Sequence, residues 1–164
     1  MKIVSIDLST HQVGITIQDK DKITTLTIPD ILEQAKFQLL DLSLVQKAIH
    51  QLVSIIPYDS DYILIEWANI QGQPKYITFI AAVASGLMCV YRTTKIIPMC
   101  EARWLKLADK TFLPKRNTFP SGRANNKKWL RAIAEKLTNH KFKSQDEIDS
   151  YVMLKTFIYN KEKF

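Results

Sequence analysis

The chain has 164 residues, of which 46% are hydrophobic, and its formal net charge is +7. This composition excludes a disordered or fibrous chain, and the length predicts one domain over residues 1–164. Two cysteines without a histidine partner argue against a zinc site, so Cys89 and Cys100 are interpreted as small core residues. Without a signal pattern or a membrane-length apolar run, we expect a cytoplasmic protein that does not contact membranes.

Three short strand patterns open the chain, over residues 2–7, 12–18 and 22–28. Polar turn residues separate these patterns, which predicts an antiparallel meander. A helical pattern then extends from Pro29 to about Ile56.

The middle of the chain alternates strand and helix patterns. Residues 62–66 form an apolar strand pattern, a second long helix is predicted over 74–92, and a brief strand follows at 95–98. A short helix is expected near 101–107. Residues 109–124 combine prolines, glycine and charges without periodicity, which predicts a loop.

Two further helical patterns close the chain, and the second begins with Ser144 and Glu147 in a capping-box arrangement. A meander continued by strand–helix units predicts an α/β fold. We expect a mixed five-stranded sheet, an antiparallel meander plus parallel strands, flanked by helices.

The positive charge is concentrated between Arg103 and Arg131, where nine basic residues accompany a single acid, Asp109. This segment carries +8, which leaves −1 for the rest of the chain. A solvated surface explains such concentration poorly, and a nucleic acid partner explains it better. The expected DNA-binding residues are Arg103, Lys115, Arg116, Arg123, Lys127, Lys128 and Arg131.

Four acids are candidates for chemistry. Asp7 and Glu66 each end an apolar strand pattern, where an unpaired charge is costly. Asp146 and Asp149 are three residues apart and therefore share one helix face. Taken singly, Asp7 and Glu66 are more typical of exposed turn acids, and Asp146 and Asp149 are typical of acids near a helix N-terminus. Together they predict a site for hard cations such as Mg²⁺, which prefers oxygen ligands.

Three segments, KIVSIDLST, YILIEWAN and DEIDSY, resemble in this order the motifs of the RuvC family of Holliday-junction resolvases. The resemblance implies an RNase H-like fold and a homodimer that nicks two strands of a four-way junction with Mg²⁺ or Mn²⁺. It also implies a basic residue that touches the scissile phosphate, for which Lys127 is preferred over Lys128. The implied catalytic and metal-binding acids are Asp7, Glu66, Asp146 and Asp149.

Several positions differ from the family pattern. Ser5-Ile6 and Leu8-Ser9 replace the glycine and the Pro-Gly pair that usually flank the aspartate. Asn69 replaces an aromatic residue that enters the junction, although Trp67 is nearby. These differences indicate a divergent, bacteriophage-type member, encoded within a bacterial host, that also acts on three-way and flap structures.

The resemblance also places the small-residue helix over 76–91 near the dimer interface. Trp104 and Trp129 are candidates for stacking on bases, with Trp129 better explained as core. The leading hypothesis is a magnesium-dependent endonuclease for branched DNA. The alternatives are an RNase H-like nuclease acting on RNA–DNA hybrids and a non-catalytic branched-DNA-binding protein.

Overall fold

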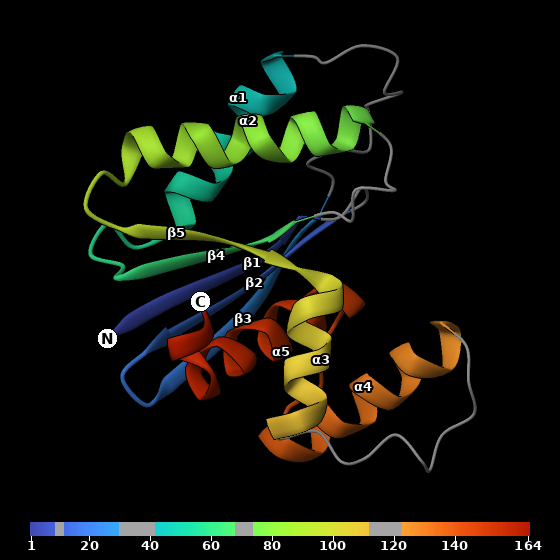
Figure 1. The fold of residues 1–164 in the computed structure, drawn as a ribbon. Helices are drawn as coiled ribbons and strands as arrows, with labels where there is room; N and C mark the ends of the chain where they lie inside the picture. The colour runs from blue at the N-terminus through green and yellow to red at the C-terminus, as the bar shows by residue number, and fades with distance from the viewer. Residues whose placement is uncertain (9–11, 30–41, 68–73, 112–122) are drawn as a thin grey trace.

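A computed structural model describes residues 1–8, 12–29, 42–67, 74–111 and 123–164 (Figure 1). The elements, in chain order, are β1 (Lys2–Leu8), β2 (Gln12–Asp19), β3 (Lys22–Pro29), α1 (Leu42–Ile55), β4 (Tyr62–Trp67), α2 (Pro74–Val90), β5 (Lys95–Cys100), α3 (Glu101–Thr111), α4 (Arg123–Thr138), α5 (Gln145–Tyr159) and the 3-10 turn η2 (Lys161–Lys163).

The strands form one sheet in the order β3-β2-β1-β4-β5. β1 pairs antiparallel with β2, and β2 with β3, whereas β1–β4 and β4–β5 are parallel. The predicted mixed five-stranded sheet is therefore confirmed. Its central strand, β1, is buried from Ile3 to Leu8, as expected for a strand that helices cover on both faces.

Helices cover the two faces of the sheet in separate layers (Figure 1). α1 and α2 pack on one face in a cluster that includes Val4 and Ile6. α3, α4 and α5 pack on the other face in a cluster that includes Ile3. Since side chains alternate along a strand, Ser5 and Asp7 point to the same face as Ile3, toward the layer of α3, α4 and α5.

Two predicted boundaries are wrong. Pro29 ends β3 instead of starting a helix, and α1 begins at Leu42, while residues 30–41 of the predicted helix lie outside the described residues. Both ends of the predicted loop over 109–124 are helical, because α3 extends to Thr111 and α4 starts at Arg123. α3 is mostly polar and buries a narrow apolar side with Trp104 and Ala108.

The cysteine interpretation is also wrong. Cys89 is exposed and Cys100 only partly buried, and both are free thiols. Cys89 lies in the last turn of α2 beside the exposed Met88 and Val90, where the helix leaves the sheet. Among the described helices, none combines the length and the apolar character that crossing a membrane requires.

Candidate active site

Strand pairing brings Asp7 and Glu66 together. In the parallel pair of β1 and β4, Ile6 is opposite Ile65, so the next residues, Asp7 and Glu66, are neighbours at the carboxyl ends of the two strands. Glu66 shares a strand face with Leu64, which belongs to the cluster under α3, α4 and α5. Only 6% of Asp7 is exposed, and its carboxyl group and that of Glu66 each shift the pKa of the other.

Helix α5 brings Asp146 and Asp149 to the same end of the sheet. Its first turn is capped as predicted, because Ser144 Oγ accepts a hydrogen bond from the Glu147 backbone N–H. Glu147 in turn accepts from the Lys143 backbone N–H at 2.7 Å. Two hydroxyl pairs attach the helix to the sheet: Thr16 with Ser150 at 2.8 Å and Thr27 with Ser144 at 3.1 Å.

Gly14 permits the close approach of α5. This residue lies directly opposite Asp7 in the pair of β1 and β2. A Cβ atom at position 14 would overlap the backbone carbonyl of Asp146 and would lie 2.6 Å from the Glu147 nitrogen. The missing side chain therefore lets the α5 N-terminus rest on the sheet beside Asp7.

We expect Gly14→Ala to destabilise the fold by about 3 kcal/mol, because the new methyl group meets rigid backbone. Urea unfolding measures this loss, and catalytic activity should fall with it as Asp146 is displaced. Gly86→Ala is the matched control, since its Cβ would meet the flexible Ile49 side chain and alanine favours a helix. Equal destabilisation by both variants would contradict this role of Gly14.

Burial and the charges of neighbouring acids raise the pKa values of Asp7 and Asp149. Burial raises the pKa of Asp7 well above its usual range, and the charges of Glu66, Asp149 and Asp146 add to the effect. Burial and then the charge of Glu66 raise the pKa of Asp149 to about 7, although Gln145 donates to Asp149 Oδ1 at 2.9 Å. Burial likewise raises the pKa of Glu66. The fold therefore holds carboxylates together at a cost that a bound cation would relieve.

Oxygen-rich, partly buried carboxylates fit a divalent cation such as Mg²⁺. Within the described residues, Asp7, Glu66 and Asp149 form no salt bridge. The described part of the chain also contains no group of three or more Asp, Glu, His or Cys side chains already arranged to hold one ion. The acids are thus neighbours in this structure without converging on a single point.

A fifth acid, Glu101, was missed in the sequence. It follows β5 directly, and β5 pairs with β4 so that Met99 lies opposite Glu66. Its charge contributes to the raised pKa values of Glu66 and Asp149, and its own side chain is exposed. The rule that found Asp7 and Glu66, an acid ending an apolar strand, also describes Glu101. It was missed because the predicted strand ended at Pro98.

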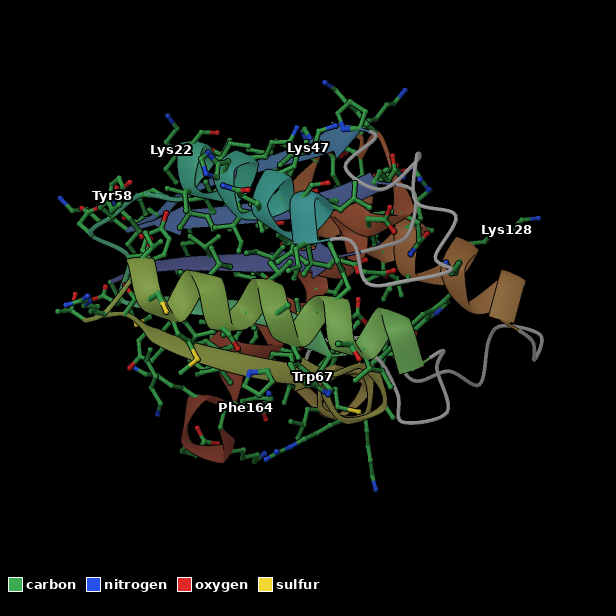
Figure 2. All side chains as sticks on the ribbon, turned by 90° about the horizontal axis from the view of Figure 1, so that it is seen from above. Lys22, Lys47, Tyr58, Trp67, Lys128 and Phe164 are labelled. Atoms are coloured by element: carbon green, nitrogen blue, oxygen red, sulfur yellow. The ribbon has the colours of Figure 1, made fainter. Side chains whose placement is uncertain are left out.

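Among the predicted basic residues that the structure describes, Lys127 is near enough to the acids for its charge to lower the pKa of Asp149. Lys127 and Lys128 are both exposed on α4, and Lys128 extends outward from the helix (Figure 2).

The other predicted DNA-binding residues divide into two groups. Arg103 donates to the Lys163 carbonyl at 2.5 Å and lies over the Phe164 ring. Arg131 donates to the Phe142 carbonyl at 2.9 Å and pairs with Glu135. Both arginines therefore make contacts within the protein. Lys115, Arg116 and the side chain of Arg123 lie outside the described residues.

The aromatic candidates for stacking on bases are buried. Trp104 is 1% exposed and Trp129 is 2% exposed, so the stacking interpretation of Trp104 is wrong and the core interpretation of Trp129 is confirmed. Trp67 lies partly buried at the end of β4 (Figure 2). Asn69 lies outside the described residues.

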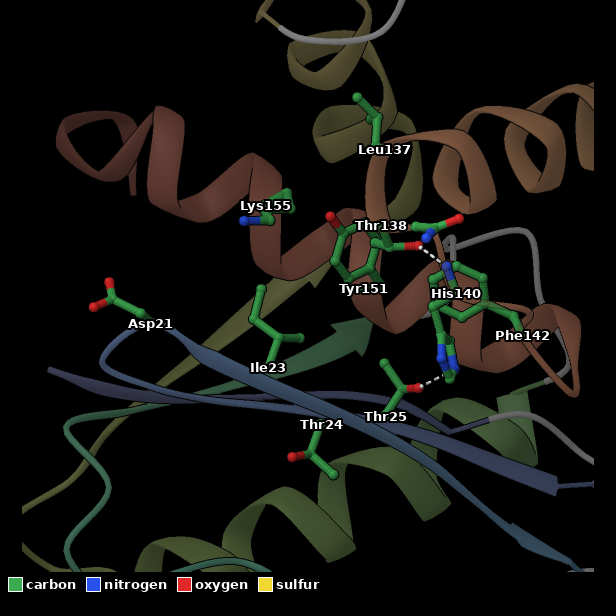
Figure 3. Close-up of a pocket in the computed structure, with 11 residues that line it drawn as sticks. Asp21, Ile23, Thr24, Thr25, Leu137, Thr138, His140, Phe142, Tyr151 and Lys155 are labelled. Atoms are coloured by element: carbon green, nitrogen blue, oxygen red, sulfur yellow. Dashed lines mark hydrogen bonds between the residues drawn. The ribbon is translucent and has the colours of Figure 1, made fainter.

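A cavity of about 540 Å³ lies between β3, the end of α4 and α5 (Figure 3). Tyr151 and Phe142 form part of its wall, and Lys155 and Asp21 also line it. The five acids do not contribute to its lining. This cavity is therefore separate from the candidate active site, on another side of α5.

No protein family profile and no curated protein matches the chain. Among solved structures, the Thermus thermophilus RuvC in complex with a Holliday junction substrate aligns with 99% of this chain and 96% of its own, with a TM-score of 0.65 and 7% identity. A second Thermus thermophilus RuvC structure covers the same shares, with a TM-score of 0.62 and 8% identity. The chain therefore has the RNase H-like fold of RuvC.

Proposed function

We propose that this protein is a metal-dependent endonuclease that nicks Holliday junctions and other branched DNA. The observation that carries the proposal is the meeting of Asp7, Glu66 and the acids of α5 at one end of a RuvC-like sheet. The solved RuvC structure whose fold it shares is in complex with a Holliday junction substrate. The concentration of basic residues between Arg103 and Arg131 supports a DNA partner.

The residues that would hold Mg²⁺ or Mn²⁺ are Asp7, Glu66, Asp146 and Asp149. Two such ions, when bound, supply activation of a water molecule and stabilisation of the leaving oxygen in phosphodiester hydrolysis. The chain's own contribution is to position the carboxylates. Gln145 orients Asp149 through its amide, and Gly14 lets α5 approach Asp7.

The test compares Mg²⁺-dependent nicking of a mobile four-way junction, a three-way junction, a flap, linear duplex and an RNA–DNA hybrid. We expect cleavage of the branched DNAs and little of the duplex or the hybrid. Binding should weaken steeply with salt, because contacts to phosphates release counterions. Preferred cleavage of the hybrid would favour an RNase H-like activity, and binding without cleavage would indicate a non-catalytic protein.

Lys127 is the proposed contact to the scissile phosphate. We expect Lys127→Ala to lower the single-turnover cleavage rate by about tenfold to a hundredfold, since a charge placed beside the reacting phosphate stabilises the transition state. Lys128→Ala is the matched control, because it removes an equal charge from the next residue. It should weaken junction binding slightly and change the rate little. Equal losses of rate would contradict the assignment of Lys127.

We also propose that the protein acts as a homodimer, since a two-fold dimer places two active sites on symmetric strands of a junction. The end of α2 supports this proposal, because Met88 is 60% exposed and Val90 is 40% exposed. Light scattering should give twice the monomer mass. Met88→Glu should shift the mass toward the monomer, whereas Leu137→Glu, at an exposed residue of α4, should not.

A further inference from the structure

Trp104 packs on the strand that carries Glu66, in the same cluster as Leu64. Helix α3 continues from β5 without a gap, and Trp67 is opposite Cys100 in the pair of β4 and β5. The first turn of α3 therefore starts beside the end of β4, where Glu66 is located. Trp104 packs in the same cluster as Leu64 and Met99 and is 1% exposed.

The indole N–H of Trp104 is a buried donor without a hydrogen-bond partner at full bonding distance among the described residues. A buried donor without a partner lowers the stability of the fold by about 1–3 kcal/mol, so a neighbouring acceptor is important. That neighbour is Glu66, since the adjacent Trp104 lowers the pKa of this carboxyl group. The donor and the carboxyl group are therefore neighbours, although no hydrogen bond joins them in this structure.

We propose that Trp104 is a positioning residue, whose indole N–H directs one Glu66 oxygen and leaves the other facing Asp7 and the metal site. The inference rests on the proposed function, since it assigns Glu66 to the metal site. Indole suits this role because its N–H only donates and carries no charge. A lysine or arginine at position 104 would neutralise the carboxylate that the cation needs, whereas the indole orients it and leaves it charged.

The first test observes the indole directly. The chain has three tryptophans, so a ¹H–¹⁵N spectrum should show three indole signals, which Trp67→Phe, Trp104→Phe and Trp129→Phe assign, any two of these variants being sufficient. We expect the Trp104 signal to move when Mg²⁺ is added to the whole protein and to move in Glu66→Gln. The Trp129 signal should stay in place in both experiments. An unmoved Trp104 signal in Glu66→Gln would overturn the proposal.

The second test measures Mn²⁺ binding without DNA, by electron paramagnetic resonance. Groups that orient metal ligands typically change metal affinity 10–100-fold, so we expect Trp104→Phe to weaken Mn²⁺ binding by about tenfold. Trp129→Phe, which alters an equally buried ring of the same cluster, should bind Mn²⁺ within about twofold of the unaltered protein. Equal affinities for the two variants would overturn the proposal.

These measurements distinguish a failure of the Trp104 proposal from a failure of the proposed nuclease function. If Trp104→Phe does not fold, the indole signals of the unaltered protein and of Glu66→Gln still decide the outcome. If the protein cuts no DNA, the proposed function fails, whereas a moving Trp104 signal and a weakened Mn²⁺ affinity would still assign Trp104 to Glu66.

Discussion

Asp7→Asn should abolish DNA cleavage while junction binding survives. The substitution keeps the size of the side chain and removes the charge of the most buried of the proposed metal ligands. Metal-ion catalysis contributes several kcal/mol of transition-state stabilisation, and each 1.36 kcal/mol is a tenfold change in rate. We therefore expect a loss on the order of 10³-fold in single-turnover cleavage of a four-way junction.

The matched control is Asp21→Asn, which removes an equal charge from an exposed turn residue away from the acids. It should cleave at the normal rate. Junction affinity, measured in Ca²⁺ by gel shift, should change by less than about threefold in Asp7→Asn, because the basic residues supply most of the binding energy. Full cleavage by Asp7→Asn would remove Asp7 from the site.

Asp149→Asn should stabilise the metal-free protein at pH 8. The folded-state pKa of Asp149 is about 7, against a usual value of 3.8. Because the folded state favours the protonated form, the contribution of Asp149 to stability is present at low pH and is lost as the pH rises from about 4 to 7. Asparagine removes this penalty and can still accept the Gln145 hydrogen bond. After a discount for partial exposure, we expect a gain of about 2 kcal/mol at pH 8.

Urea unfolding at pH 5 and pH 8, without metal, measures this effect. The gain should be smaller at pH 5, where Asp149 is already protonated in the folded protein. Asp59→Asn is a control of opposite sign, since Lys2 lowers the pKa of Asp59, and it should bring no gain. Millimolar Mg²⁺ should stabilise the unaltered protein more than Asp149→Asn. A loss of stability in Asp149→Asn at both pH values would contradict the electrostatic account.

The local patterns in the sequence were sufficient for much of the fold. The meander, the parallel strands β4 and β5 and the capped start of α5 were predicted, because strand patterns and capping depend on residues close together in the chain. Asp7 and Glu66 could be proposed for the same reason, since each follows an apolar strand. The end of α3 and the start of α4 were predicted as loop, because the residues there are mostly polar or charged.

The sequence by itself determined which acids end the buried strands and where the positive charge is concentrated. Only the tertiary structure decided which of these groups meet. The pairing of β5 with β4 added Glu101 to the acids, and the packing of α3 turned Trp104 from a candidate for base stacking into a buried neighbour of Glu66. The approach of α5 gave Gly14 its role. These contacts join residues far apart in the chain, and local periodicity carries no information about such distances.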